Sequence, residues 1–185
     1  MEKTATKFQT LAEADNADRE FYQKLSGEER LKILLQLTHH EPERRLRESI
    51  ASLNSHGVEY VIVGAHSLAF HSRPRYTGDL DILVRPSPEN AARLAAVMNE
   101  FGFAGTGFKE SDFAEPDQII QLGRVPNRID LLTGITGVAT DEAFQTKIGT
   151  HLEGLPIFIL SKPLLIQNKR AVARPQDIAD LDTLS

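Results

Sequence analysis

Two aspartates separated by a single residue, Asp79 and Asp81, stand inside an apolar, strand-forming run. Side chains of a strand alternate between its two faces, so both carboxylates are expected to point the same way while Leu80 and Ile82 point into the core. Carboxylates this close repel each other, and each is costly to bury without a partner. A shared divalent cation would remove both penalties, and Mg²⁺ prefers oxygen ligands. The pair therefore predicts a metal site; the alternative is a solvated turn after Gly78.

The elements that must position this pair begin with a β-branched apolar run, residues 61–63, which stops at Gly64. A short helix is expected over residues 65–71, followed by a turn and then by a strand over residues 79–84. Glycine permits the sharp strand-to-helix turn, and such a turn can aim helix N-terminal N–H groups at a phosphate. The turn and the aspartates are thus expected to act together.

Gly64-Ala65, separated by thirteen residues from Asp79-Leu80-Asp81-Ile82, resembles the signature of the nucleotidyltransferase superfamily of the DNA polymerase beta type. The chain is similar to the bacterial minimal and kanamycin-type nucleotidyltransferases and to the nucleotidyltransferase-like proteins of toxin–antitoxin systems. The resemblance implies an α/β (α+β) nucleotidyltransferase fold, with a mixed central sheet flanked by helices. Ala65 departs from the family pattern, which has Gly or Ser there; Ser67 is the hydroxyl that would replace the lost contact.

The same resemblance places a third carboxylate on the strand beside the aspartate pair, and Asp130 in residues 127–132 fits it. It implies that Asp79, Asp81 and Asp130 are the catalytic and metal-binding residues, holding Mg²⁺, with Asp130 also the general base. In such sites one metal ion acidifies the attacking hydroxyl and another stabilises the leaving pyrophosphate. The alternative for Asp130 is a salt bridge with Arg128 at the end of a strand.

A further group of residues is assigned to the nucleotide by the resemblance. Lys169 precedes an Arg-Pro-x-Asp-x-x-Asp-Leu segment, residues 174–181, that is seen in many bacterial nucleotidyltransferase-like proteins. A lysine there would neutralise charge on the leaving group, and its alternative is a surface lysine. The residues expected to bind nucleotide are Gly64, Ala65, Ser67, Arg75, Thr77 and Lys169.

Composition limits the alternatives. The 185 residues are 41% hydrophobic and 25% charged, with a net charge of −5, which is ordinary for a globular chain and disfavours general coating of nucleic acid. The chain has no cysteine, so disulfides, thiolate metal sites and cysteine nucleophiles are excluded. No apolar run reaches membrane-spanning length and the N-terminus lacks a signal peptide's apolar core, so cytoplasmic residence is expected.

Two regions are expected: a helical N-terminal extension, residues 1–57, and a nucleotidyltransferase domain, residues 58–185. The extension should contain a helix after a capping box at Ser26 and another that ends at Gly57. In the second region, helices are expected near residues 88–101, 141–147, 162–170 and 175–181. Strands are expected at 118–123, 128–133 and 155–160, and residues 103–117 are expected to form a loop bordering the site.

The function expected from these features is Mg²⁺-dependent transfer of a nucleoside monophosphate from an NTP, such as ATP, to an acceptor hydroxyl. The acceptor stays open between an RNA end, a protein side chain and a small molecule. The competing hypothesis is a toxin–antitoxin component that uses the fold mainly as a surface for a cognate toxin or antitoxin. Retention of all three carboxylates favours the enzyme.

Overall fold

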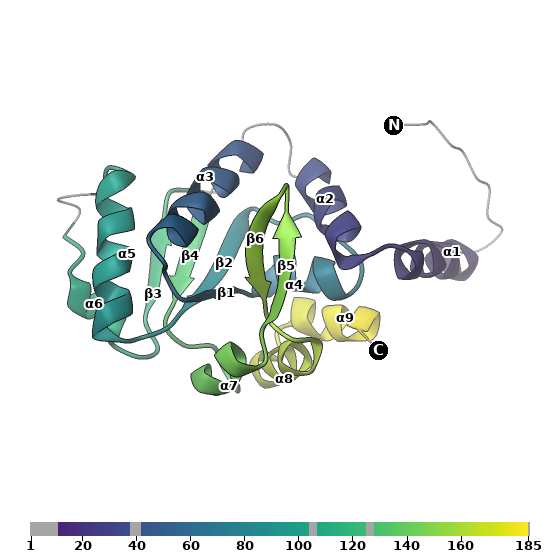
Figure 1. Cartoon of the computed structure of the whole chain (residues 1–185). Helices are drawn as coiled ribbons and strands as arrows, with labels where there is room; N and C mark the ends of the chain where they lie inside the picture. Colours follow the sequence, from purple (N-terminus) through teal and green to yellow (C-terminus); the bar gives the residue numbers. More distant parts are fainter. Residues whose placement is uncertain (1–10, 38–41, 104–106, 125–127, 185) are drawn as a thin grey trace.

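A six-stranded mixed sheet occupies the centre of the molecule, with helices on both sides (Figure 1). The computed structural model describes residues 11–37, 42–103, 107–124 and 128–184. The strand order is β3-β4-β2-β1-β6-β5. The strands are β1 (Tyr60–Ile62), β2 (Asp79–Val84), β3 (Ile119–Leu122), β4 (Arg128–Leu132), β5 (Ile148–Leu152) and β6 (Leu155–Ile159). The expected mixed sheet flanked by helices is confirmed at this level.

Strand β2 lies at the middle of the sheet, antiparallel to β1 and parallel to β4. Its successive residues enter two different hydrophobic clusters: Ile82 belongs to the larger cluster and Leu83 to the smaller. Since both faces of the sheet are covered, the second half of the strand is apolar throughout rather than alternating. Asp79 and Asp81 share the face of Leu83, while Leu80 packs in the larger cluster, as expected.

The smaller cluster lies between the sheet and four helices, one directly after the glycine turn and three in the C-terminal part of the chain. These are α4 (Gly64–His71), α7 (Thr140–Gln145), α8 (Lys162–Val172) and α9 (Pro175–Leu184). Helix α4 contacts β2, α8 and α9, so the elements that carry Gly64, the aspartate pair and Lys169 adjoin one another.

Three helices span most of the described part of residues 1–57: α1 (Leu11–Lys24), α2 (Gly27–Leu37) and α3 (Pro42–Ser55). The capping box before α2 forms as expected: Ser26 N donates to Glu29 Oε2 at 2.7 Å, and Glu29 N donates to Ser26 Oγ at 3.2 Å. Leu34 and Ile50 are fully buried in the larger cluster together with sheet residues. Helices α2 and α3 therefore share a core with the sheet.

One expectation for local structure was wrong, and one strand was not expected. Part of residues 103–117 is the short helix α6 (Glu110–Ala114), which packs on α5 (Pro88–Glu100) and buries Phe113, so it is not simply a loop at the site. Strand β5 was missed, although it pairs along its whole length with β6. Among the described helices, none combines the length and the hydropathy that a membrane span requires.

Candidate functional site

The three predicted carboxylates lie on two neighbouring parallel strands. Asp81 of β2 is the register partner of Asp130 of β4, and Asp79 lies two residues before Asp81 on the same face. Register partners on parallel strands project to the same side of a sheet. The carboxylates therefore share one face, and Asp130 does not lie on the opposite side of the sheet.

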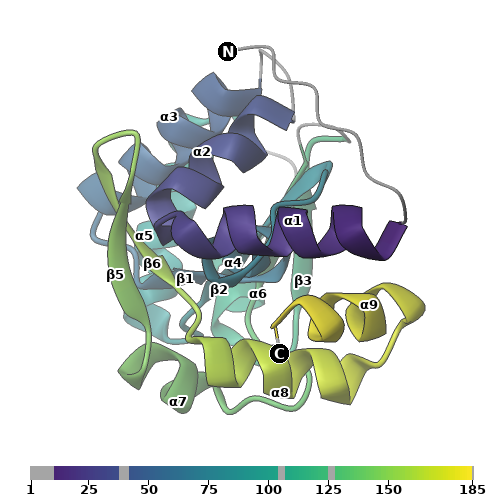
Figure 2. The same ribbon diagram turned by 90° about the vertical axis from the view of Figure 1, so that its right-hand side faces the viewer.

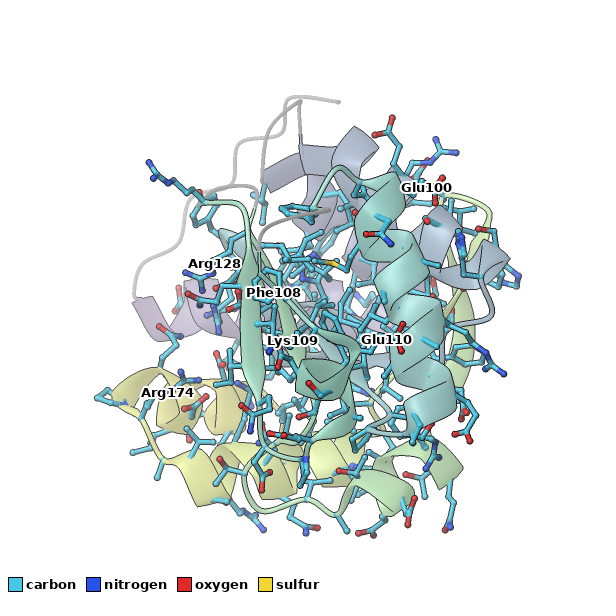
Figure 3. All side chains as sticks on the ribbon, turned by 90° about the vertical axis from the view of Figure 1, so that its left-hand side faces the viewer. Glu100, Phe108, Lys109, Glu110, Arg128 and Arg174 are labelled. Carbon is cyan, nitrogen blue, oxygen red and sulfur yellow. The ribbon has the colours of Figure 1, made fainter. Side chains whose placement is uncertain are left out.

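An arginine bridges two of these carboxylates. Arg128 Nη2 lies 2.5 Å from Asp79 Oδ2, and Arg128 Nε lies 2.8 Å from Asp130 Oδ1. Thr77 Oγ1 also donates to Asp79 Oδ1 at 2.6 Å, and Gln121 Nε2 donates to Asp130 Oδ2 at 3.3 Å. The salt bridge considered as the alternative for Asp130 is therefore present, and it extends to Asp79. Figure 3 shows Arg128 and Arg174 on the same side of the strands, with Glu100 and its helix α5 on the other side.

Asp81 is partly buried, whereas Asp130 is 6% exposed. Burial raises the pKa of Asp81 to about 6, with further increases from the negative charges of Asp79 and Asp130; Arg128 and Arg174 act in the opposite direction. The carboxylate is pressed against the glycine turn: a Cβ placed on Gly64 would lie 1.9 Å from Asp81 Oδ2. Asp81 therefore joins the glycine turn to the aspartate cluster in space.

His66, in the first turn of α4, is 4% exposed and lies close enough to Asp79 for that carboxylate to influence its pKa. Burial lowers its pKa to about 4, which outweighs the opposing influence of Asp79. Its Nδ1 has no hydrogen-bond partner among the residues that the structure describes. The ring is therefore neutral at physiological pH and adds no positive charge to the site.

The charge and the ligand type of this cluster fit a hard divalent cation. Three carboxylates lie around the guanidinium of Arg128, and the charges of Asp79 and Asp130 add to the burial that raises the pKa of Asp81. Within the described ranges, however, no set of three acidic or histidine side chains is arranged so as to hold an ion. Arg128 bridges Asp79 and Asp130 in this arrangement.

The residues predicted to bind nucleotide divide into two groups. Gly64, Ala65 and Thr77 adjoin the carboxylates through the glycine turn and through the Thr77–Asp79 hydrogen bond. Ser67 is completely buried, and its hydroxyl donates to the Leu160 carbonyl at 3.2 Å. The phosphate contact considered for Ser67 is therefore not offered by this structure, because the hydroxyl faces the interior.

Lys169 and Arg75 have carboxylate partners inside the protein. Lys169 is 3% exposed, and its Nζ donates to Asp180 Oδ2 at 2.6 Å and to Asp177 Oδ1 at 3.2 Å. Arg75 contacts the same Asp180 through Nε at 3.0 Å and Nη2 at 3.1 Å. Lys169 is thus neither a surface lysine nor, here, directed at an open site. Its role toward a triphosphate stays a prediction.

The two aspartates of this ion-pair network are held as anions. Burial acts to raise the pKa of Asp180, but hydrogen bonds from Arg75 and Lys169 outweigh it and leave the pKa below its ordinary value. For Asp177, burial is likewise outweighed by Arg174 and Lys169. The network joins the segment before β2 to α8 and α9, so it fixes how the C-terminal helices sit beside the site.

Arg128 and Arg174 are site residues that the sequence analysis did not assign. Arg128 lies two residues before Asp130 on a strand, so the period of two was a usable signal that both share a face. Arg174, in the connection between α8 and α9, pairs with Asp177, and its charge acts on Asp81 of β2. No comparable sequence signal existed for Arg174, because that proximity is tertiary.

Comparison with known proteins adds no assignment: no protein-family model matches the chain, and no match was found among curated proteins.

Proposed function

We propose that this chain is a Mg²⁺-dependent nucleotidyltransferase of the DNA polymerase beta type, which moves a nucleoside monophosphate from an NTP to an acceptor hydroxyl. The observation that carries the proposal is the placement of Asp79, Asp81 and Asp130 on one face of two adjacent parallel strands, beside the Gly64 turn. The sheet with helices on both sides supports the nucleotidyltransferase fold.

In the proposed reaction the acceptor oxygen attacks the α-phosphorus of the NTP. The new oxygen–phosphorus bond forms as the bond to the bridging oxygen breaks, and pyrophosphate leaves with the electron pair. The acceptor's proton passes to Asp130, the carboxylate nearest to β3. Asp79, Asp81 and Asp130 would hold Mg²⁺, which supplies charge neutralisation at the phosphates and acidifies the attacking hydroxyl when it is bound.

The surrounding residues keep the carboxylates in place for this task. Thr77 orients Asp79, Gln121 orients Asp130, and the Gly64 backbone leaves room for Asp81. Arg128 neutralises Asp79 and Asp130 through its two ion pairs and would have to move aside for a cation. Since its side chain is 26% exposed, the guanidinium has a route into solvent.

The competing function, a toxin–antitoxin component that uses the fold as a protein-binding surface, has one observation in its favour. Lys169, Arg75 and Arg128 all make ion pairs within the protein. Such ion pairs occupy the cations that would otherwise bind NTP, as expected for a fold that no longer binds it.

The deciding experiment is transfer of label from α-³²P-labelled NTPs, tested one nucleotide at a time with Mg²⁺, to acceptors in a native cell extract. The proposal expects a labelled RNA, protein or small molecule with the wild-type protein. It expects none with Asp81→Asn and full labelling with Glu115→Gln, a surface control at the end of α6. A cell extract without any labelled acceptor, combined with retention of a partner protein, would favour the competing function.

A further inference from the structure

A second concave site lies away from the carboxylate cluster. It is a cavity of about 300 Å³ bounded by α1, by the end of α4, by the start of α8 and by α9. Figure 2 shows α1 lying across the molecule above α8 and α9, the side on which these elements meet. None of the carboxylates or cluster residues described above lines it. The volume is at the lower end of the range for small-molecule sites.

The lining of this basic cavity is strongly cationic. Arg19, Arg30, Arg73 and Lys162 contribute four positive charges against one carboxylate, that of Asp182. Asp18 approaches Arg73 at 3.9 Å from a largely exposed position, which leaves an excess of positive charge even when it is counted. The chain as a whole has a net charge of −5, so the charge of the cavity is opposite in sign to that of the whole protein.

One of these cations is fixed and forms the wall of the basic cavity. Arg30 Nε and Nη2 donate to the Phe70 carbonyl at 3.0 and 2.6 Å, and Nη1 donates to the carbonyls of Tyr22 and Leu25, each at 2.9 Å. This guanidinium ties the end of α1 to the end of α4. Its donors are used by the protein, so it acts on the cavity only through its positive charge. Arg73 is likewise paired within the protein, with Asp18. Arg19 and Lys162 are exposed cations of the lining that can contact a ligand.

His71 lies in the same lining as these cations. Its Nε2 lies 2.6 Å from the Leu160 carbonyl, and a carbonyl can only accept, so Nε2 carries the proton. Burial lowers the pKa of His71, and the charges of Lys162 and Arg30 lower it further.

We propose that the basic cavity binds the phosphate group of a small phosphorylated metabolite. Arg19 and Lys162 supply the charge-assisted contacts, Arg30 and Arg73 add positive charge to the walls, and the half-buried ring of Tyr22 lines the place of the organic part. Walls on α1, α4 and α9 enclose the space on several sides, which suits a small molecule better than a continuous polymer. The site does not depend on the nucleotidyltransferase proposal, because α4 separates the two by its own length, roughly 10 Å for eight residues.

The test is calorimetric titration of the full chain, in EDTA, with pyrophosphate, ribose 5-phosphate and AMP as probes. The pocket variant is Arg19→Gln/Lys162→Gln. The control variant is Lys24→Gln/Arg170→Gln, which removes the same two charges from the same two helices outside the cavity. The proposal expects binding of at least one probe to the wild type, roughly tenfold or more weaker binding to the pocket variant, and a change within about twofold for the control.

Changes in amide chemical shifts show separately where a probe binds. Shifts of Ser72 and Thr183 indicate binding in the basic cavity, and shifts of Gly64 and Asp81 indicate binding at the carboxylate cluster. Equal weakening of both double variants would overturn the proposal in favour of general surface attraction. So would shifts confined to Gly64 and Asp81, or no binding of any probe at millimolar concentration. Binding of a single-stranded RNA that is lost in the pocket variant, without binding of the small probes, would replace the metabolite with a polymer.

Discussion

The carboxylate of Asp81 lies directly over the backbone of Gly64, which has a φ of +58°. A Cβ at Gly64 would meet not only Asp81 Oδ2 but also its Cγ, at 2.8 Å. Two features that are separate in the sequence, a glycine turn and an aspartate pair, are thus in contact. Glycine is required here for two reasons, the left-handed backbone and the room for a carboxylate.

Gly64→Ala is expected to lower the free energy of unfolding by more than the backbone conformation alone would. A non-glycine residue in the left-handed region costs about 1 to 3 kcal/mol, and displacement of Asp81 adds to this. Gly57→Ala is the matched control, because Gly57 has a φ of +64° and nothing within 4 Å of its Cβ position. Urea denaturation compares the two variants, and equal losses would contradict the contact with Asp81.

Asp81→Asn is expected to stabilise the protein at neutral pH. Because the folded-state pKa is raised to about 6, the folded protein holds this proton where the unfolded chain has released it, and stability falls as pH rises from about 4 to about 6. The amide removes that loss, which is of order 2 to 3 kcal/mol above pH 6.

Urea denaturation of Asp81→Asn at pH 4, 5.5 and 7.5 checks this dependence, with Glu115→Gln as the surface control. The gain over wild type should be small at pH 4 and should grow with pH. A gain that does not change with pH would show that the charge of Asp81 is not its cause. Asp79 is a poorer choice for this experiment, because Arg128 and Thr77 both bind its carboxylate.

Lys169→Ala is expected to destabilise the protein by about 3 kcal/mol at pH 7, since it leaves buried carboxylates with an uncompensated charge. Asp177 and Asp180 are each 2% exposed and would lose their shared ammonium. The pKa values of both carboxyls are lowered in the folded protein, so the contribution is complete above their unfolded pKa and is lost as pH falls through the folded values.

Thermal unfolding of Lys169→Ala beside Arg170→Ala, an exposed cation on the same helix, measures this effect. The surface control is expected to change stability by no more than about 0.5 kcal/mol. Similar melting temperatures for the two variants at pH 7 would show that the buried network contributes little. In acid, the difference in melting temperature between the two variants is expected to be smaller than at pH 7.

The central strands were predictable because local pattern and burial agree there. In β2 the apolar residues enter both clusters and only the first half carries charge, so the strand and the face of its aspartates follow from period two. Strand β5 gave no such signal. It is an edge strand of sequence IGTHL, in which Gly149 and His151 are exposed and only Leu152 is buried, so neither alternation nor an apolar run marks it.

The partners of the site residues were harder to predict than the residues themselves. Arg75 and Asp180 are 105 positions apart, and their pairing depends on how α9 docks beside the segment before β2. Ser67 follows the glycine turn in sequence, but its position on α4 directs its hydroxyl into the interior, toward the Leu160 carbonyl. The residue types in the sequence indicated the possible chemistry. The packing of α8 and α9 determined which of these side chains form hydrogen bonds or ion pairs within the protein.

Arg128→Gln is expected to strengthen binding of a divalent cation at the carboxylate cluster. The guanidinium contacts Asp79 at 2.5 Å and Asp130 at 2.8 Å, so it neutralises two of the three carboxylates that would hold the ion. Removing it exposes their charge, while Thr77 and Gln121 still orient them. Without metal, the variant should lose about 1 to 3 kcal/mol of stability, because charge-assisted hydrogen bonds are lost.

The measurement is Mn²⁺ binding followed by electron paramagnetic resonance, with Arg124→Gln as an exposed control near the end of β3. We expect Mn²⁺ to bind Arg128→Gln roughly tenfold more tightly than wild type, the equivalent of about 1.4 kcal/mol of relieved competition. Adding Asp81→Asn to Arg128→Gln should abolish that gain, because one of the three carboxylates expected to hold the ion is then lost. Unchanged or weaker Mn²⁺ binding in Arg128→Gln would mean that the arginine does not occupy the place of an ion, and that the three carboxylates are held together by Arg128 for structural reasons.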